Sequence, residues 1–257
     1  TADQEKKSIT IVTTTGILGD CVSQIVDGQA EVVSIMGAGV DPHLYKASQG
    51  DISKLSEADI IVYNGLHLEG KMAQMLKNFS KTKPVFAIGD YIEKSDLKQV
   101  DNTSDLVDPH VWFSPYLWLD GLSGIAKELD KNDGLDSILE NYQDYAKNIQ
   151  STQIKLQQLL NDSLDSTKRI LITSHDAFEY FGDAFEFEVR GLQGISTTAE
   201  YGTRDIKELT DFIIKNELKS VFVETSVPNK NLEAVVASAR ARGYNIRIGG
   251  TLYSDAL

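Results

Sequence analysis

Cysteine is almost absent from this sequence, which contains one, Cys21, among 257 residues. No disulfide can form within the chain, and a cysteine-rich zinc site or a CxxC redox motif is excluded. Cys21 lies inside the first structured segment, at residues 16–22, where a lipid-attachment site is not expected. We predict a small buried side chain at this position.

Long hydrophobic runs and an excess of positive charge are also missing. No stretch of about 18 apolar residues occurs, so no membrane-spanning helix is expected. The 25 basic residues are outnumbered by 38 acidic ones, which gives a net charge of −13 at pH 7. A chain with this charge repels nucleic acid and acidic lipid surfaces and favours the approach of cations. We therefore expect no nucleic-acid partner.

Short β-branched runs alternate with longer segments of helical periodicity. In the first half the predicted strands span residues 8–15, 31–36, 59–64 and 84–88. In the second half they span residues 169–174, 185–190, 220–225 and 245–248. The intervening segments are long enough for crossover helices, which join parallel strands. The predicted fold is α/β, with two lobes that each hold a mainly parallel four-stranded sheet flanked by helices.

One long helix is predicted between the two groups of strands. Residues 136–164 contain neither proline nor glycine, and apolar side chains recur on one helical face at Ile138, Tyr142, Tyr145, Ile149, Leu156 and Leu159. About 28 helical residues span roughly 40 Å, which is enough to bridge two lobes and to restrict their relative movement. The predicted division is an N-terminal lobe at residues 1–134, a connecting helix at 135–165 and a C-terminal lobe at 166–257. An ordinary amphipathic helix packed along one domain is the alternative.

Histidine is scarce, and two of the four histidines belong to a repeated tripeptide, Asp41-Pro42-His43 and Asp108-Pro109-His110. Proline fixes its own backbone and restricts the residue before it, so each tripeptide presents an imidazole from a stiff corner. His43, His110 and His175 follow predicted strands, and Asp255 follows the last one. Ligands of open α/β sheets bind outside the carboxyl ends of the strands. We predict that these four side chains, two from each lobe, meet at one metal site in the interlobe cleft.

Three further residues are candidates for supporting roles around this site. His67, the fourth histidine, also follows a strand and is predicted to line the cleft or to support a ligand. Glu200 and Glu224 are candidate acceptors for the second ring N–H of a ligand histidine, because such carboxylates orient metal-binding imidazoles.

Several motifs occur in a consistent order along nearly the whole chain. They are DPHLY at residues 41–45, YNGLHLE at 63–69, DPHVW at 108–112, TSHDAF at 173–178, GLQGIS at 191–196, FVETS at 222–226 and SDA at 254–256. This order resembles the zinc- and manganese-binding receptors of ABC transporters, and most closely the TroA-type receptors. The resemblance implies two α/β lobes bridged by a long helix, one metal ion between them and no catalytic activity. The family's four ligands fall on His43, His110, His175 and Asp255.

The resemblance also implies a location and partners. Such receptors are extracytoplasmic, membrane-anchored lipoproteins that capture one Zn²⁺ or Mn²⁺ ion and deliver it to an ABC permease, and we expect a monomer. The tether is not within these residues. Relatives continue into a final helix beyond the position of Leu257, so the C-terminal lobe is expected to lack that helix and Asp255 to lie near a frayed end.

The third ligand distinguishes between the two metals. Manganese-dedicated relatives carry Glu where this chain has His175. Three imidazoles and one carboxylate suit tetrahedral zinc, which binds more tightly than manganese in the Irving–Williams order. A bidentate Asp255 raises the coordination number to about five and admits manganese. Residues 96–108 contain no histidine, unlike the His-rich loop of dedicated zinc receptors. Zinc is therefore placed first and manganese second.

Two other functions fit the same residues. A zinc-dependent hydrolase would use the three histidines to hold a metal-bound hydroxide, with Asp255 outside the coordination sphere. Four protein ligands leave no position for that water, and no HExxH or HxHxD pattern accompanies the histidines. A receptor for an organic ligand, or an adhesin that binds a host protein, would share the two-lobed architecture.

Overall fold

Four parallel strands form the sheet of the N-terminal lobe in the computed structural model, which describes residues 8–100 and 105–256. They are β1 (Ile9–Thr15), β2 (Ala30–Met36), β3 (Ile60–Tyr63) and β4 (Val85–Ala87), in the spatial order β2-β1-β3-β4. The α-helices of this lobe are α1 (Gly16–Val26), α2 (Gln49–Glu57), α3 (Ala73–Phe79) and α4 (Pro115–Leu129). Short 3₁₀ turns are η1 (Ile88–Tyr91), η2 (Lys94–Asp96) and η3 (Val111–Phe113). The four strands predicted for this half are confirmed.

The starts of two helices in this lobe are encoded locally. At α2, Ser48 Oγ accepts a hydrogen bond from Asp51 N, and Asp51 Oδ2 accepts one from Ser48 N, which forms a capping box. At α4, Ser114 Oγ accepts from Leu117 N, and Pro115 occupies the first helical position, where its missing N–H costs nothing. A cap of this kind stabilises a helix by about 1 kcal/mol.

The C-terminal lobe contains four strands that are also parallel. They are β5 (Ile170–His175), β6 (Glu188–Gln193), β7 (Ser220–Glu224) and β8 (Arg247–Leu252), and its helices are η4 (Ser166–Lys168), α6 (Glu179–Phe185), α7 (Thr203–Lys215) and α8 (Lys230–Ala241). The predicted α/β fold is therefore confirmed. The four-stranded sheet predicted for this lobe is not continuous, because backbone hydrogen bonds join the strands as two parallel pairs, β5-β6 and β7-β8, with β5 beside β7.

Two strand boundaries in this lobe differ from the prediction. The strand predicted at 185–190 begins at Glu188, because α6 continues to Phe185 and ends at Glu186, which is in the left-handed region (φ 62°). The strand predicted at 245–248 continues to Leu252 through Gly249 and Gly250. A β-bulge lies at this glycine pair, because Val221 pairs with Ile248 and Phe222 with Gly250, which leaves Gly249 as the extra residue.

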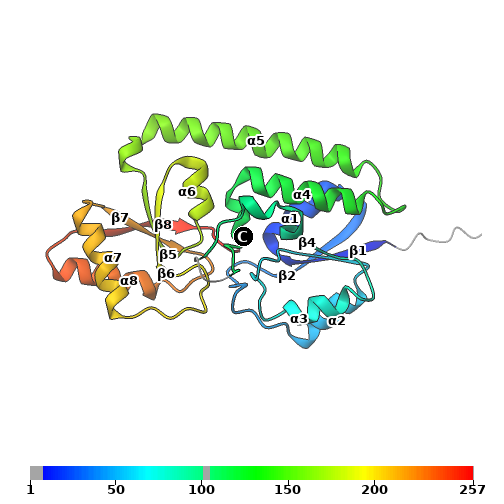
Figure 1. The fold of residues 1–257 in the computed structure, drawn as a ribbon, viewed down its shortest axis with the longest axis horizontal. Coiled ribbons are helices and arrows are strands. Elements are labelled where there is room, and N and C mark those ends of the chain that lie inside the picture. Colours follow the sequence, from blue (N-terminus) through cyan, green and yellow to red (C-terminus); the bar gives the residue numbers. More distant parts are fainter. Residues whose placement is uncertain (1–7, 101–104, 257) are drawn as a thin grey trace, which may run out of the picture.

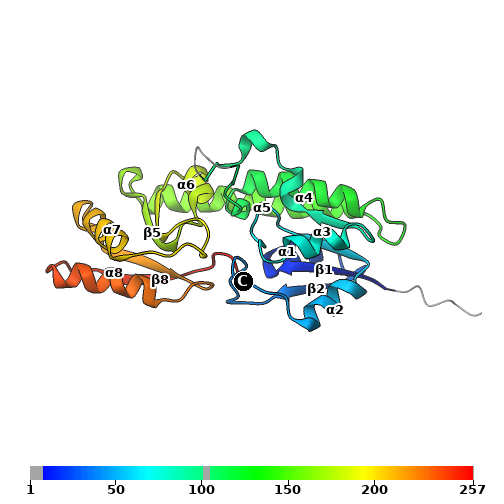
Figure 2. The same ribbon diagram turned by 60° about the horizontal axis from the view of Figure 1, so that its bottom comes forward.

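The long helix α5 (Ile138–Ser163) runs across both lobes (Figure 1, Figure 2). Its first half is fixed to the N-terminal lobe, since Asn141 Nδ2 donates to Ile25 O (3.0 Å) and Tyr142 Oη donates to Leu119 O (2.8 Å). Near its end, Asn161 Oδ1 accepts from Arg169 Nη2 (2.6 Å), directly before β5. The helix is thus attached at both ends, as expected for a bridging element.

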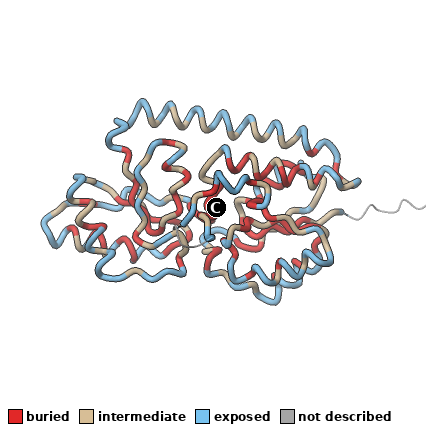
Figure 3. The backbone as a smooth tube through the Cα atoms, viewed as in Figure 1, coloured by how far each residue is buried: buried red, intermediate tan, exposed pale blue. Residues whose placement is uncertain are grey.

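Buried residues lie in both lobes (Figure 3), and each lobe has a hydrophobic core of its own, with Tyr180 of α6 joining the core of the N-terminal lobe. Cys21 lies in the N-terminal core at 3% exposure, as predicted, and burial raises the pKa of its thiol to about 11. Tyr145 and Ile149 of α5 pack against the same core. Leu159, predicted on that helix face, is 61% exposed, because the buried stripe does not continue to the end of α5. Among the described residues no helix has the length and apolar character that a bilayer span requires.

Helix α4 approaches the chain at Tyr91 closely, and this generates a stability prediction. A methyl group at Gly124 would overlap the Cβ and Cγ atoms of Tyr91, which cannot swing aside because they lie at the root of the side chain. We expect Gly124→Ala to lower the free energy of unfolding by about 1–3 kcal/mol, the usual cost of overpacking. Gly16→Ala, where the nearest atom is Met36 O at 3.9 Å, is the matched control. Urea unfolding of the two variants checks this, and an unchanged Gly124→Ala midpoint would contradict the packing.

Candidate metal centre

Four side chains from separate segments converge between the lobes. His43 follows β2, His110 precedes η3, His175 is the last residue of β5, and Asp255 follows β8. Their candidate ligand atoms lie within 4.8 Å of one another, and all four residues are buried. The C-terminal end of the chain lies between the two lobes in both ribbon views (Figure 1, Figure 2). The structure therefore brings together the four residues that the sequence singled out.

The spacing of these atoms matches the ligand shell of one small cation. His110 Nε2 lies 3.3 Å from His43 Nε2 and 3.4 Å from His175 Nε2. The carboxylate oxygens of Asp255 lie 3.3–3.7 Å from the three ring nitrogens. A tetrahedral zinc site with bonds of about 2.0–2.1 Å has ligand atoms about 3.3–3.4 Å apart. The donor set therefore fits a single ion of this size.

The Asp255 carboxylate is buried and faces three imidazole rings. It is 1% exposed, and neither of its carboxylate oxygens has a hydrogen-bond partner among the described residues. Burial by itself raises the pKa of Asp255, but the three imidazoles, His175 first, outweigh it and keep that pKa below its usual range. A buried charged carboxylate without donors is costly unless a cation compensates it. Asp255 is also well packed, contrary to the expectation of a frayed end.

Two of the histidines are backed by carboxylates of their own lobe. Asp108 Oδ1 accepts from His110 N (3.0 Å) and lies 2.6 Å from His110 Nδ1. Glu224 Oε1 accepts from His175 N (2.9 Å), and its Oε2 lies 2.6 Å from His175 Nδ1. Each carboxylate engages Nδ1 and so directs Nε2 toward the centre, as metal-site histidines require.

Of the two carboxylates predicted to support a ligand histidine, Glu224 lies at the centre and Glu200 does not. Glu224 has the predicted position, with 2% exposure, whereas Glu200 lies at the surface. Asp108 was not singled out as a support, although its place two residues before His110 was the available signal.

His43 is held differently. Asp41 Oδ1 accepts from His43 N (2.9 Å), while Asp41 Oδ2 accepts from Thr197 Oγ1 (2.6 Å) in the other lobe. Burial lowers the pKa of His43 to about 3, with Asp255 opposing that shift. Burial also lowers the pKa of His175, but the Asp255 and Glu224 carboxylates outweigh it and hold that pKa well above its usual range. The centre thus favours the neutral form of one imidazole and the protonated form of another.

Comparison with known proteins agrees with this geometry. Residues 11–257 match the family model described as ZnuA, zinc-uptake complex component A periplasmic. The chain belongs to this family. The chain is 41% identical over 258 residues to the manganese-binding lipoprotein MntA of Bacillus subtilis (strain 168). This alignment covers 100% of this chain and 83% of that protein. It is 39% identical over 249 residues to the zinc-binding protein TroA of Treponema pallidum (strain Nichols), with 96% and 80% covered.

A solved structure of a relative matches the fold of this ZnuA-family chain. The periplasmic zinc binding protein TroA from Treponema pallidum superposes with a TM-score of 0.92 at 38% sequence identity, over 97% of this chain and 90% of that one. The predicted resemblance to zinc- and manganese-binding receptors of ABC transporters is confirmed.

The fourth histidine lies outside the cluster. His67 is exposed and lines a cavity of about 620 Å³ with Tyr63, Glu69 and Leu97, among others. It follows Gly65 and Leu66, and all three residues have positive φ. His67 therefore lines a separate cavity and is not one of the four converging side chains.

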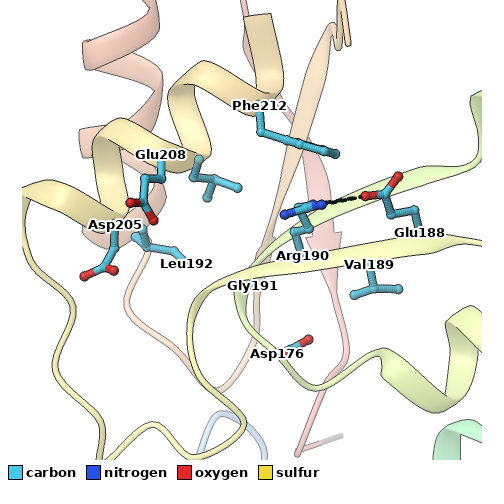
Figure 4. Close-up of a pocket in the computed structure, with 10 residues that line it drawn as sticks. Asp176, Glu188, Val189, Arg190, Gly191, Leu192, Asp205, Glu208 and Phe212 are labelled. Carbon is cyan, nitrogen blue, oxygen red and sulfur yellow. Dashed lines mark hydrogen bonds and ion pairs between the residues drawn. The ribbon is translucent and has the colours of Figure 1, made fainter. Parts of the chain in front are cut away.

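A further cavity, of about 380 Å³, lies in the C-terminal lobe beside β6 and α7 (Figure 4). The guanidinium carbon of Arg190 lies 3.9 Å from the centroid of the Phe212 ring, and Arg190 Nη2 lies 2.9 Å from Glu188 Oε1. The lining includes Asp176, which directly follows His175, but none of the four converging residues. This cavity is separate from the candidate metal centre, and its one arginine is already paired.

The low pKa of His43 predicts a pH-dependent stability of the metal-free chain. Unfolded His43 takes up a proton near pH 6.5, whereas the folded residue, which faces Asp255, His110 and His175, does so only near pH 3. Its contribution to stability is therefore lost as the pH falls from about 6.5 toward 3, by up to about 1.4 kcal/mol per pH unit. We expect the unfolding free energy of the wild type to decline relative to that of His43→Gln over this range.

Urea unfolding in the presence of a chelator, repeated from pH 7 to pH 4, checks this prediction. Comparison of the two proteins removes the contributions of titrating groups remote from the centre. A difference between them that does not change with pH would contradict the buried, neutral state of His43.

Proposed function

We propose that this chain is an extracytoplasmic receptor that captures one divalent metal ion and delivers it to the membrane permease of an ABC transporter. The observation that carries the proposal is the convergence of three buried imidazoles on a buried carboxylate with no hydrogen-bond partner. We assign His43, His110, His175 and Asp255 as the ligands. The relatives MntA and TroA are named as manganese-binding and zinc-binding proteins, and the first as a lipoprotein. A lipid tether is therefore part of the proposal.

Zinc is the first candidate and manganese the second. Three nitrogen ligands and one carboxylate match the donor preference of zinc, and the spacing of the ligand atoms fits zinc bond lengths. Both oxygens of Asp255 face the imidazoles, Oδ1 toward His110 and Oδ2 toward His43 and His175. A carboxylate in this orientation can bind through both oxygens, and the higher coordination number suits manganese.

Capture exchanges a proton for a metal ion. In the metal-free centre His175 carries a proton beside Asp255, and this proton must leave before Nε2 can bind a cation. His43 is already neutral and ready to bind. Metal binding therefore weakens as the pH falls, and acidification favours release.

Metal capture also couples to the arrangement of the lobes. We propose the division into lobes at residues 1–134 and 166–257 joined by residues 135–165, so that each lobe supplies two ligands. Because α5 is attached to both lobes, it limits their movement to a small rearrangement. A permease can read the loaded state from that arrangement, and we propose that the receptor acts as a monomer without catalytic activity.

The rival functions have less support from the same geometry. A hydrolase needs an open coordination position, and four converging ligand atoms fill a tetrahedral shell. Ester hydrolysis that disappears in His175→Ala would favour the hydrolase. An organic ligand needs a cavity at the site, and none of the four residues lines the cavity beside β6 or the one beside His67. Tight binding of a metal chelate without any response to free metal would favour a receptor for an organic ligand.

Added metal is expected to stabilise the chelator-stripped protein. A ligand at 100 times its dissociation constant adds about 2.7 kcal/mol to the stability of the native state. Thermal unfolding with one equivalent of Zn²⁺ or Mn²⁺ measures this, and we expect the larger shift with Zn²⁺. His110→Ala should abolish the shift, whereas His67→Ala, at the exposed histidine, should retain it. No shift of the wild type with either ion would exclude metal capture.

Glu224 supports His175, and its removal is expected to weaken binding. Glu224→Gln keeps the size of the side chain but places an amide beside His175 Nδ1, which removes the negative charge that orients the ring. Loss of such a partner typically lowers metal affinity 10- to 100-fold, so we expect about that change. Competition with a chromophoric chelator measures it. Glu200→Gln, at the surface, is the control, and equal affinities of the two variants would contradict the supporting role.

A further inference from the structure

The three histidines of the centre are not supported in the same way. Asp108 and Glu224 hold the rings of His110 and His175 from within the lobe that carries each histidine. The corresponding residue for His43 is Asp41, whose Oδ1 accepts from His43 N (2.9 Å). The second oxygen of Asp41 accepts a hydrogen bond of 2.6 Å from Thr197, which lies 156 residues away in the other lobe. The segment that carries His43 is thus held across the lobe interface.

The backbone that carries the Thr197 hydroxyl is held by hydrogen bonds within the C-terminal lobe. Gln193 Nε2, at the end of β6, donates to Thr197 O (3.4 Å) and to Ala199 O (3.0 Å). Gln193 Oε1 in turn accepts from Asn231 Nδ2 (3.0 Å) on α8, and Asn231 Oδ1 accepts from Tyr201 Oη (3.0 Å). Thr197 is 9% exposed. These bonds fix the position of Thr197 relative to the C-terminal lobe, so Thr197 moves together with that lobe.

The segment before His43 contains two glycines and lies beside the C-terminal lobe. Gly37, Ala38 and Gly39 are exposed, and Gly39 has a φ of 75°, which glycine adopts without strain. A methyl group on Gly39 would lie 3.6 Å from Thr225 O, directly after β7. The backbone that leads to His43 therefore passes close to the C-terminal lobe.

The side of the interface near His110 is fastened separately. Lys98 Nζ lies 2.9 Å from Glu179 Oε2 and 3.0 Å from Asp183 Oδ1, both on α6. Tyr180 Oη accepts from Lys98 N (3.0 Å) and donates to Asp108 O (3.1 Å). The His110 corner is thus attached to α6 by several bonds, whereas a single hydroxyl links Asp41 to Thr197.

We propose that the Asp41–Thr197 hydrogen bond is an interlobe latch and that Thr197 is a positioning residue for metal retention. With the latch closed, Asp41 holds His43 on the ion, and release of the ion requires the bond to open. Hydroxyl-to-carboxylate bonds at this distance are among the stronger hydrogen bonds of proteins. The inference rests on the proposed metal capture, because the latch has a function only if His43 is a ligand.

The test is the rate of zinc release from the loaded chain. Thr197→Val keeps the shape of the side chain and removes the hydroxyl, so we expect release into excess chelator to become about 10- to 100-fold faster, the effect of losing one hydrogen bond to a charged group. Thr197→Ser keeps the hydroxyl and should restore slow release. Thr198→Val is the matched control, because the Thr198 hydroxyl pairs with Ser196 (2.8 Å) at the exposed surface. Its release rate should equal that of the wild type.

A second variant tests the latch from the other lobe. Asp41→Asn keeps an oxygen for His43 N and removes the charge that faces Thr197, so its release should also be faster. Because the two changes break one bond, the double variant should release zinc no faster than the quicker single variant.

The outcomes separate the latch from metal capture itself. Release from Thr197→Val at the wild-type rate, or fast release from Thr197→Ser, would overturn the latch while zinc binding stands. Multiplied rates in the double variant would also overturn it. Failure of the wild type to retain zinc would overturn the proposed function instead. Thermal unfolding of the metal-free variants shows whether Thr197→Val is folded, and Asp41→Asn decides the question if it is not.

Discussion

The interaction on which the rest of the structure depends is the meeting of one carboxylate and three imidazoles in a volume closed to water. Asp255 is 1% exposed, and its oxygens have no hydrogen-bond partner among the described residues. A charged group in such a place is stable only beside a positive charge. In the metal-free chain the carboxylates raise the pKa of His175 and so favour its protonated form, while burial lowers the pKa of His43 and favours its neutral form. We propose that the centre is a preformed cation site in which a proton and a metal ion compete.

The four converging side chains are divided between the two lobes, with His43 and His110 on one and His175 and Asp255 on the other. Each lobe delivers them from the region of the carboxyl ends of its parallel strands, where α/β folds place their ligands. Asp108 and Glu224 orient the rings within each lobe, so the remaining freedom is the placement of one lobe against the other. Helix α5 restricts the movement of one lobe against the other along one side, and hydrogen bonds across the interface restrict it near the proposed metal site. In the proposed receptor, metal binding and lobe arrangement are thereby coupled without a wide hinge.

The sequence predicted the converging residues because their signals are local. His43 and His110 each belong to an Asp-Pro-His tripeptide, His175 directly follows a predicted strand, and the bridging helix is indicated by the absence of proline and glycine. Other features depend on contacts that have no local pattern. Gly249 and Gly250 lie inside β8, where Phe222 and Ser220 pack so close to Gly249 that an added methyl group would lie only 3.0 Å from each. The bond between Asp41 and Thr197 joins residues 156 positions apart, so its existence follows only from the packing of the two lobes.

X-ray absorption at the zinc edge, recorded on protein loaded with one equivalent of Zn²⁺, tests the central claim most directly. The account predicts a shell of about four nitrogen and oxygen atoms at about 2.0–2.1 Å, with outer-shell scattering from three imidazole rings. The imidazole signal should fall by one ring in His43→Ala. An oxygen-only shell without imidazole scattering, or protein that retains no zinc after gel filtration, would contradict it.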